Sequence, residues 1–386
     1  MINLSTKLAS KGFTITFVQT EFIHHSISKD HYHHLLSADF DIFTEARKSG
    51  LDIRYTTISD GFPLDFDRHL NGDLFWETMF RDFPDRVDEV VARTMKDEEE
   101  SCFFLIADTL CSWPATIAKK YNMVKEADII LCNTVEELEP ETLSAQNQKH
   151  PTYAIGPINF YTDFTNMIIP RSLWPESDCT GWLHSKPPGS VLYVSFGSFA
   201  QSNKQLTAEL AHGLLSSEVH FLWIIRPDVV GENGIDDILP IGFEDVTKDR
   251  GLIVPWCNQN RVLSSPAIGG FLTHCGWNSV LESIWYGVPM ICYPFYVDQP
   301  TNRKLVVDDW KIGVNLCDGE QVTREEVANK INVVMNGEKS AELKREIKKV
   351  SKKLHDSLGS GGSSERNFNQ FMDDLKAKLY VRSKDG

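Results

Sequence analysis

The sequence lacks several patterns that identify whole classes of protein. No apolar run approaches the roughly 18 residues that a membrane-spanning helix needs, and the first residues, MINLSTKLASKG, lack the apolar core of a signal peptide. The eight cysteines include no CxxC pair, which argues against a zinc site and a disulfide framework. We therefore expect reduced, mostly buried thiols, a cytosolic location, no metal site and no membrane span.

Basic residues are also fewer than acidic residues. The 39 lysine and arginine residues are outnumbered by 54 aspartate and glutamate residues, which gives a formal net charge of −15. This balance argues against nucleic acid or an anionic membrane as the main partner. The segment GSGGSS at 359–364 follows no strand, so we interpret it as a turn, and the lack of a properly placed GxGxxG disfavours a nicotinamide oxidoreductase.

The length and the pattern of what is present predict two α/β domains. With 386 residues, 41% of them apolar, the chain is long for one hydrophobic core and long enough for two. Turn-forming residues with little periodicity predict a linker at 158–172. The sequence thus predicts a first domain at 1–157, a second at 173–364 and a terminal helix at 365–386.

Short apolar runs alternate with helical patterns, as expected for parallel sheets. In the first domain we expect strands at 13–18, 53–58, 102–107 and 129–132, and helices at 4–8, 85–96 and 114–121. In the second we expect strands at 191–196, 221–225, 251–255, 268–273 and 290–293, and helices at 204–215, 278–286 and 323–335. Ser202 is the expected N-cap of the helix at 204–215, Thr323 to Glu326 has the capping-box form, and the terminal helix carries Phe368, Phe371 and Leu375 on one face.

The chemistry of the chain is concentrated in residues 256–299. This stretch has the order strand, tight corner, helix, glycine stop and strand, which is one βαβ unit. Its polar residues gather at the corner and on the first turns of the helix: His274, Trp277, Asn278, Ser279 and Glu282. In an open parallel sheet such a corner binds ligands, and the exposed N–H groups at a helix N-terminus favour an anion, above all a phosphate.

The same stretch, WCNQNRVLSSPAIGGFLTHCGWNSVLESIWYGVPMICYPFYVDQ, resembles the signature box of plant family 1 UDP-glycosyltransferases. VLYVSFGS at 191–198 and GGSSERNF at 361–368 are similar to that family too. The segments SDGFPLDFDR, YAIGP and TNRKLVVDDW place the resemblance nearest to the subgroup numbered 86.

The resemblance implies a GT-B fold, in which two Rossmann-like domains face a cleft and the last helix crosses back to the first domain. It implies inverting, metal-independent transfer of a hexose, with glucose favoured, from a UDP-sugar to a hydroxyl of a small lipophilic plant metabolite. The UDP-sugar is then a co-substrate, no further cofactor is needed, and we expect a monomer.

Roles for the donor-site residues follow from the resemblance. Trp256 would stack on uracil and the Cys257 backbone would bind its edge, while Gln259 and Glu282 would bind the ribose. Taken singly, Trp256 is better explained as a core aromatic, His274 as a turn residue and Glu282 as helix surface, and only their joint spacing favours a binding role. Asp298 could also be a helix N-cap. The diphosphate would be held by Ser198, His274, Asn278 and Ser279, and the sugar by Trp277, Asp298 and Gln299.

The acceptor side matches the family less completely. Asp108 matches the aspartate that orients the family's general-base histidine, but the sequence begins after the place where that histidine and its strand would lie. Relatives also carry several tens more residues near Val124 and Lys125. His24 or His25 could substitute as a base, although loop histidines are commoner, and Trp113 and Phe62 could line an acceptor pocket or simply pack in the core. The alternative hypothesis is therefore a truncated, non-catalytic paralogue that binds UDP without efficient turnover.

Overall fold

The computed structural model describes residues 1–31, 41–68, 70–96, 102–108, 112–121, 123, 129–161, 174–198, 203–230, 235, 238–319 and 321–385. The chain divides into two compact units. Unit 1 is Met1–Leu173 with Asp356–Gly386, and unit 2 is Trp174–His355. Most of the predicted linker, 162–172, lies outside the described residues, and η1 (Ile158–Phe160) occupies its start.

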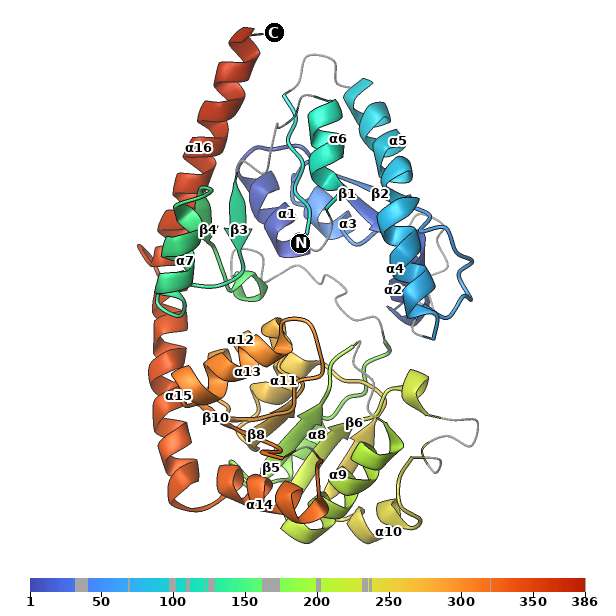
Figure 1. Cartoon of the computed structure of the whole chain (residues 1–386), viewed down its shortest axis with the longest axis vertical. Helices are drawn as coiled ribbons and strands as arrows, with labels where there is room; N and C mark the ends of the chain where they lie inside the picture. The colour runs from blue at the N-terminus through green and yellow to red at the C-terminus, as the bar shows by residue number, and fades with distance from the viewer. Residues whose placement is uncertain are drawn as a thin grey trace. The chain divides into compact units, whose positions relative to one another are not determined.

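Unit 2 contains a six-stranded sheet in which all pairings are parallel (Figure 1). The strand order is β10-β9-β8-β5-β6-β7. The chain therefore runs from β5 through β6 to β7 at one edge of the sheet, and from β8 through β9 to β10 at the other edge. These two strands mark a topological switch point, where the loops at the carboxyl ends diverge. The strands are β5 (Val191–Ser195), β6 (His220–Ile224), β7 (Gly251–Val254), β8 (Ile268–Thr273), β9 (Met290–Cys292) and β10 (Gly313–Asn315).

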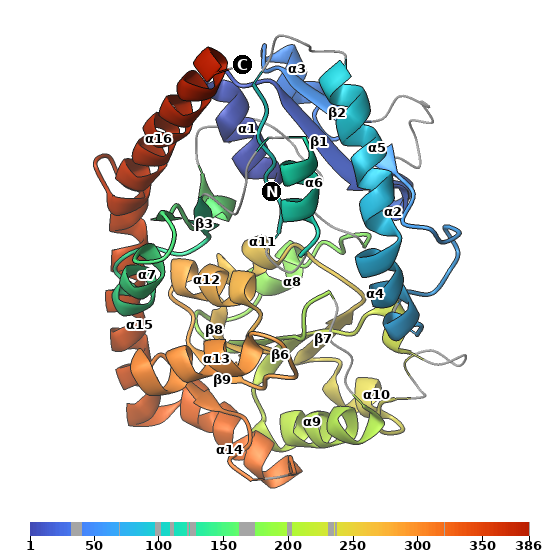
Figure 2. The ribbon, with the colours of Figure 1, turned by 45° about the horizontal axis from the view of Figure 1, so that its top comes forward.

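The central strands of this sheet are fully buried because helices cover the sheet on both sides. Every residue of β5 and β8 is buried, which explains their unbroken apolar runs. α9 (Lys204–Ser217) packs against α14 (Arg324–Met335) so closely that a Cβ at Gly213 would lie 2.3 Å from the Val327 side chain (Figure 2). The other helices of the unit are α8 (Thr180–His184), α10 (Phe243–Thr247), α11 (Gln259–Leu263), α12 (Trp277–Tyr286) and α13 (Gln299–Lys304).

The helix caps agree with the prediction in part. The N-cap of α9 is Asn203, whose side chain accepts from the Leu206 N–H at 2.8 Å, whereas the predicted cap, Ser202, lies outside the described residues. Thr323 caps α14 as predicted, because its hydroxyl accepts from the Glu326 N–H at 3.3 Å. The second half of the capping box does not form, since the Glu326 carboxylate accepts from the Asp318 N–H instead.

Unit 1 holds two separate parallel pairs of strands. β1 (Ile15–Thr20) pairs with β2 (Ile53–Ile58), and β3 (Ile130–Cys132) pairs with β4 (Thr152–Ala154). β1 begins two residues later than predicted, and β2 has the predicted bounds. The helices are α1 (Ile2–Ser10), α2 (Glu21–His31), α3 (Thr44–Lys48), α4 (Gly72–Arg81), α5 (Phe83–Lys96), α6 (Pro114–Lys120) and α7 (Pro140–Asn147).

The predicted strand at 102–107 is wrong, because the described segment 102–108 belongs to neither sheet of unit 1. Its apolar side chains still alternate. Phe104 and Ile106 pack against the cluster around α1, and Phe103 and Leu105 pack against the cluster formed by α5 and α6. The period-two pattern therefore reports burial on both sides of the segment and not a hydrogen-bonded ladder.

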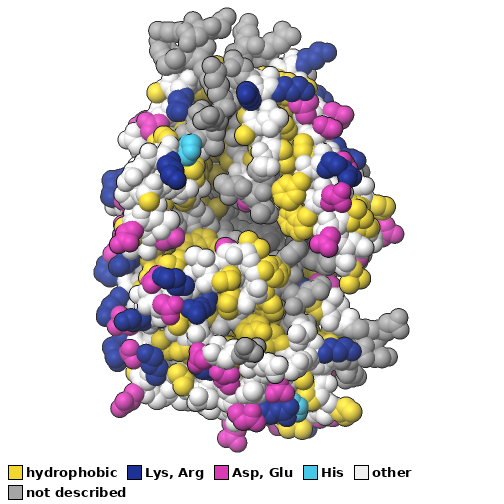
Figure 3. All heavy atoms as spheres, in the orientation of Figure 1, with side chains coloured by type: hydrophobic (Ala, Val, Ile, Leu, Met, Phe, Trp, Pro, Cys, Tyr) yellow, Lys and Arg dark blue, Asp and Glu magenta, His cyan; other side chains and the backbone are white. Residues whose placement is uncertain are grey.

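The C-terminal helix α16 (Ser363–Asp385) completes the core of unit 1. Phe368, Phe371 and Leu375 are buried against Leu8 of α1 and Tyr153 of β4. The turn at 359–362 separates α16 from α15 (Gly337–Leu358). Both helices are drawn in orange to red in Figures 1 and 2, and Figure 3 shows side chains of both charge signs on their solvent side.

Candidate functional site

The candidate site lies where β5 and β8 end side by side. Ser195 and Thr273 are partners in the ladder, so the segments that follow, Phe196 to Ser198 and His274 to Gly276, leave the sheet at the same edge. α12 then begins at Trp277 and ends at Tyr286, and the residue that follows it, Gly287, has a φ of +71°. The predicted order of strand, corner, helix, glycine stop and strand is confirmed.

The imidazole of His274 lies between two glycine backbones. A Cβ at Gly197 would lie 2.6 Å from His274 Cε1, and a Cβ at Gly276 would lie 2.4 Å from His274 Nε2. Real Cβ atoms do not approach so closely, so glycine is required at both positions for steric reasons. The corner is also strained, because the intervening Cys275 has a φ of +65°.

Burial keeps the His274 imidazole uncharged. It lowers the pKa of His274 to about 4, with Asp298 acting in the opposite direction and the positive charge of Arg226 lowering the pKa further. A neutral imidazole offers one N–H donor and one acceptor. The Nδ1 atom is buried with no hydrogen-bond partner, and such an orphaned polar atom in a native structure requires an explanation. A ligand oxygen at this corner would supply one.

A second polar group joins α11 to α12. The Gln259 side-chain amide donates from Nε2 to Glu282 Oε2 at 2.7 Å and to Ser279 Oγ at 3.0 Å. Asn260 Nδ2 donates to the other carboxylate oxygen, Oε1, at 3.3 Å, and the Tyr193 hydroxyl donates to Gln259 Oε1 at 3.3 Å. Glu282 is only 8% exposed, so its interpretation as ordinary helix surface is wrong.

Trp256 and Cys257 lie in the loop between β7 and α11. The indole of Trp256 is half-buried, and its carbonyl accepts from the Ser177 N–H at 2.9 Å. Cys257 is buried, and a hydrogen bond with Cys179 together with burial raises the pKa of its thiol. This protonated thiol is a poor nucleophile, so only the backbone of Cys257 is suited to a binding role.

Asp298 and Gln299 lie at the start of α13. Asp298 forms no side-chain cap; instead its Oδ2 accepts from Asn302 Nδ2 at 2.8 Å, and the same Asn302 nitrogen donates to the Cys275 carbonyl at 3.0 Å. Gln299 Oε1 accepts from the N–H groups of Phe295 and Tyr296 at 2.8 and 3.2 Å. The two residues therefore tie the loop after β9 to the His274 corner.

The other predicted donor residues also lie in unit 2. Trp277 is half-buried with its ring centroid 6.3 Å from that of Trp310, while Asn278 and Ser198 are exposed. Ser279 is buried. Ser198 follows β5, whereas Asn278 and Ser279 lie in the first turn of α12, so the predicted diphosphate ligands come from adjacent strand ends.

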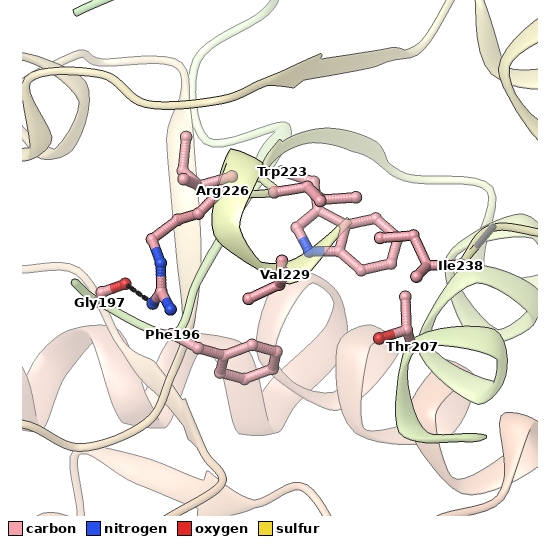
Figure 4. A pocket seen from close by; sticks show the side chains of 9 residues that line it. Phe196, Gly197, Thr207, Trp223, Arg226, Val229 and Ile238 are labelled. Carbon is pink, nitrogen blue, oxygen red and sulfur yellow. Dashed lines mark hydrogen bonds between the residues drawn. The ribbon is translucent and has the colours of Figure 1, made fainter. Parts of the chain in front are cut away.

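Sequence analysis missed Arg226 and Asn302. Arg226 follows β6 and is buried, with its Nη1 donating to the Gly197 carbonyl at 2.6 Å. Its Nε and Nη2 each donate to an Asp228 carboxylate oxygen at 2.9 Å. Figure 4 shows the bond from Arg226 to Gly197 beside a cavity of about 20 Å³, lined by Phe196, Thr207, Trp223, Val229 and Ile238 among others. The signal was available, because Arg-Pro-Asp directly follows the apolar run at 221–225.

The residues predicted for the acceptor side lie in unit 1. Asp108 is exposed at the end of the described segment 102–108, and Val124 and Lys125 are outside the described residues. His24 and His25 lie on α2 and not in a loop. His24 Nδ1 is 3.0 Å from the Tyr55 hydroxyl, and burial lowers its pKa. This placement fits a packed histidine better than a solvent-facing base.

Aromatic contacts explain the other two acceptor-side candidates. Trp113 packs edge-on against Phe83 at 5.8 Å, and Phe62 stacks on Phe66 at 4.3 Å. Figure 3 shows hydrophobic side chains on the surface around α4, where Leu74 and Phe80 are exposed. Within the described ranges, no helix is long and apolar enough to cross a membrane. The same residues contain no group of three His, Cys, Asp or Glu side chains that could hold a metal ion.

A family model described as "UDP-glucoronosyl and UDP-glucosyl transferase" matches residues 173–357. UDP-glycosyltransferase 86A1 of Arabidopsis thaliana is 44% identical over 461 aligned positions, covering 99% of this chain and 92% of the relative. UDP-glycosyltransferase 86A2 of the same plant is 39% identical, covering 98% and 92%.

The crystal structure of Os79 from O. sativa in complex with UDP has a TM-score of 0.80 with 24% identity and covers 97% of this chain and 96% of that one. The two chains therefore share a fold. The alignment with the first Arabidopsis protein is longer than the 386 residues of this chain, so that relative carries residues inside the matched span that this chain lacks.

Proposed function

The chain belongs to the family of plant UDP-glycosyltransferases and has their α/β fold of the GT-B type, and from this premise we propose that it transfers a hexose. Glucose is the favoured hexose, and the acceptor is a hydroxyl of a small lipophilic plant metabolite. The observation that carries the proposal is the His274 corner. An uncharged imidazole with an unpartnered buried nitrogen lies at the N-terminus of α12, between two adjacent strand ends. This arrangement is suited to a diphosphate.

The corner would stabilise the leaving group. As the bond from the sugar to UDP breaks, negative charge develops on the diphosphate, and donors fixed in advance stabilise it without reorganisation. The leading N–H groups of α12 supply part of this field. In our proposal His274 donates a hydrogen bond to the diphosphate, and Ser198, Asn278 and Ser279 supply further donors.

The nucleoside end would be held by α11 and the residues before it. Trp256 provides a half-exposed indole on which uracil can stack, and the Cys257 backbone offers hydrogen bonds to the base edge. The Glu282 carboxylate already accepts from two amide groups, and it has lone pairs left for the ribose hydroxyls. Gln259 fixes one of its oxygens.

The sugar would lie against Trp277, Asp298 and Gln299. The acceptor oxygen attacks the anomeric carbon from the side opposite the diphosphate, which inverts the configuration, and a base takes the hydroxyl proton. We propose that Asp108 orients such a base. Donor binding and turnover are separate properties, because the second also requires the acceptor side.

The decisive experiment uses the purified chain. Calorimetry should show UDP binding, and Trp256→Ala and Glu282→Ala should each weaken it by about tenfold, consistent with a loss of 1–2 kcal/mol from one stacked or hydrogen-bonded group. Incubation with UDP-glucose and a flavonol or phenol, followed by mass spectrometry, then decides whether the chain turns over, and a glucoside would support transfer. No UDP binding overturns the proposal. Binding without product would favour the alternative hypothesis of a paralogue that binds the donor without turnover.

We also propose a cytosolic monomer that needs no metal ion or further cofactor. The cysteines within the described ranges are all free thiols, as expected in a reducing compartment. Light scattering should give a mass near 43.8 kDa, and a fluorescent fusion should distribute through the cytosol. Transfer activity should be unchanged after dialysis against EDTA; a loss restored by a divalent cation would contradict the metal-independent mechanism.

A further inference from the structure

Arg226 links three strand ends at the candidate site. It follows β6, donates to the carbonyl of Gly197 after β5, and its charge acts on His274 after β8. Its side chain is only 4% exposed. A buried cation is costly unless it is paired and hydrogen-bonded, so its retention at this place requires a reason.

The ion pair with Asp228 satisfies only part of the guanidinium. Asp228 engages Nε and Nη2 at 2.9 Å each, which is the bidentate geometry that arginine forms best. Nη1 is directed to the Gly197 carbonyl at 2.6 Å (Figure 4). Asp228 therefore fixes the plane of the guanidinium, and the guanidinium in turn fixes one peptide group.

That peptide group joins Gly197 to Ser198. Because a trans peptide is planar, its N–H points opposite to its carbonyl. Binding of the Gly197 carbonyl to Arg226 therefore turns the Ser198 N–H away from Arg226. On its other side, Gly197 approaches the His274 ring so closely that a Cβ there would lie 2.6 Å from Cε1. The loop is thus held between Arg226 and His274.

We propose that Arg226 is a positioning residue for the diphosphate of the UDP-sugar, acting through the Gly197 carbonyl to set the Ser198 amide and the His274 ring. The inference rests on the proposed function, since it concerns the same corner. Arg226 does not touch the ligand in this account. Its guanidinium fork is essential, because a lysine ammonium cannot bind both Asp228 oxygens and the Gly197 carbonyl in the same geometry.

The test compares ligands with and without the diphosphate. Arg226→Lys keeps the charge and loses the fork, and Arg226→Met loses both. We expect each variant to bind UDP about tenfold more weakly than the wild type by calorimetry, with uridine affinity, measured by NMR titration, unchanged. Asp228→Asn leaves Arg226 in place but removes the bidentate carboxylate that fixes the orientation of its guanidinium. This variant should weaken UDP binding by a few-fold. This variant keeps the test open if Arg226→Met fails to fold.

A pH titration tests separately whether the charge of Arg226 acts on His274. The charged groups acting on His274 are Asp298 from the start of α13 and Arg226. Arg226→Met removes the positive charge, so the His274 ring signals in NMR should titrate at higher pH than in the wild type. Arg226→Lys should leave the His274 titration close to that of the wild type.

Arg250 provides a matched control in the same unit. Its guanidinium also donates to backbone carbonyls, namely those of Leu214, Leu215 and Val219 at 2.9 to 3.2 Å. Arg250→Met should lower the unfolding midpoint while the ratio of UDP to uridine affinity stays that of the wild type. If the wild type binds no UDP, the proposed function itself fails. A different outcome overturns only the positioning role. In that outcome the wild type binds UDP and Glu282→Ala weakens the binding, but the Arg226 variants keep the wild-type ratio of UDP to uridine affinity, either because neither affinity changes or because both fall by the same factor.

Discussion

The carboxylate of Glu282 is held at both oxygens by neighbouring side chains of one short helix. Gln259 Nε2 lies 2.7 Å from Oε2, and Asn260 Nδ2 lies 3.3 Å from Oε1. A buried carboxylate without such donors would pay a large desolvation cost. The pair of amides therefore gives the carboxylate of Glu282 hydrogen-bond donors and a fixed orientation at 8% exposure.

Asn260→Ala tests whether this orientation serves the ribose. We expect UDP affinity to fall by about three- to tenfold, since one hydrogen bond to a charged group is lost. The affinity for 2′-deoxy-UDP should change little, because the ribose hydroxyl that Glu282 would accept from is missing. Calorimetry with both nucleotides measures the difference. Arg261→Ala, on the exposed side of α11, is the control, and an equal loss for both nucleotides in Asn260→Ala would contradict the prediction.

A pair of glycine substitutions separates steric from conformational effects at the two ends of α12. Gly276 has an ordinary φ of −59°, but an added Cβ would lie 2.4 Å from His274 Nε2. Gly287 has a φ of +71° with no atom within 4 Å of an added Cβ. Gly276→Ala should therefore displace the imidazole and weaken UDP binding by at least tenfold.

Gly287→Ala is the matched control, because it should cost about 1–2 kcal/mol of stability through the left-handed conformation while leaving UDP affinity unchanged. Thermal unfolding and calorimetry of both variants give the two quantities. Wild-type UDP affinity in Gly276→Ala would show that the close packing around His274 has no role in donor binding.

The depressed pKa of His274 predicts a loss of stability in mild acid. The unfolded chain takes up a proton near pH 6.5, whereas the folded chain does so only near pH 4. Between these values the unfolded state binds more protons, so stability rises with pH across this window and is fully present above about pH 6.5. At pH 5 the cost is about 2 kcal/mol relative to pH 7.

Urea unfolding at pH 7 and pH 5 measures this cost. The fall in unfolding free energy between the two pH values should be about 2 kcal/mol smaller in His274→Gln than in the wild type. His220 is the comparison residue, since burial lowers its pKa too but it lies at the start of β6, at the opposite end of the strand from Arg226. Equal pH dependence in the wild type and His274→Gln would contradict the assignment of the shift to His274.

The sequence predicted the donor half of the molecule well and the acceptor half poorly, for a physical reason. β8 and α12 were located within a residue because a buried parallel strand, a glycine-bounded helix and a polar corner each leave a local pattern. β10 was not predicted, although β9, which also has three residues, was. The pattern at 102–107 indicated burial correctly, yet strand pairing depends on a neighbour that local sequence does not specify.

The same distinction explains which site residues were missed. Arg226 matters because β6 lies next to β5 in the sheet, which makes Gly197 its neighbour, and strand order is not encoded in a local motif. Asn302 reaches the Cys275 carbonyl across 27 positions in the chain. Glu282 was predicted as a ribose ligand from the resemblance, but its burial beside Gln259 of α11 was not predicted. The contacts that hold these residues at the site join separate elements, and local sequence patterns do not specify such contacts.

The burial of the terminal helix in unit 1 predicts that α16 is needed for the stability of that unit. Phe368 and Phe371 are 1% and 3% exposed, and they pack on Tyr153 and on residues of α1. Phe368→Ala removes a large buried ring, for which core substitutions of this kind cost about 3–5 kcal/mol. Gln370 lies on the same helix with an exposed side chain.

We expect Phe368→Ala to lower the unfolding midpoint of unit 1 clearly, whereas Gln370→Ala, with an exposed side chain that donates to Asp374 at 3.0 Å, should stay within about 0.5 kcal/mol of the wild type. Hydrogen exchange at the amides of β4 and α1 would locate the effect. Because His274 and Glu282 belong to unit 2, UDP affinity at low temperature should be retained in Phe368→Ala. Protection of β4 and α1 equal to that of the wild type would mean that α16 does not contribute to the core of unit 1, against the packing described above.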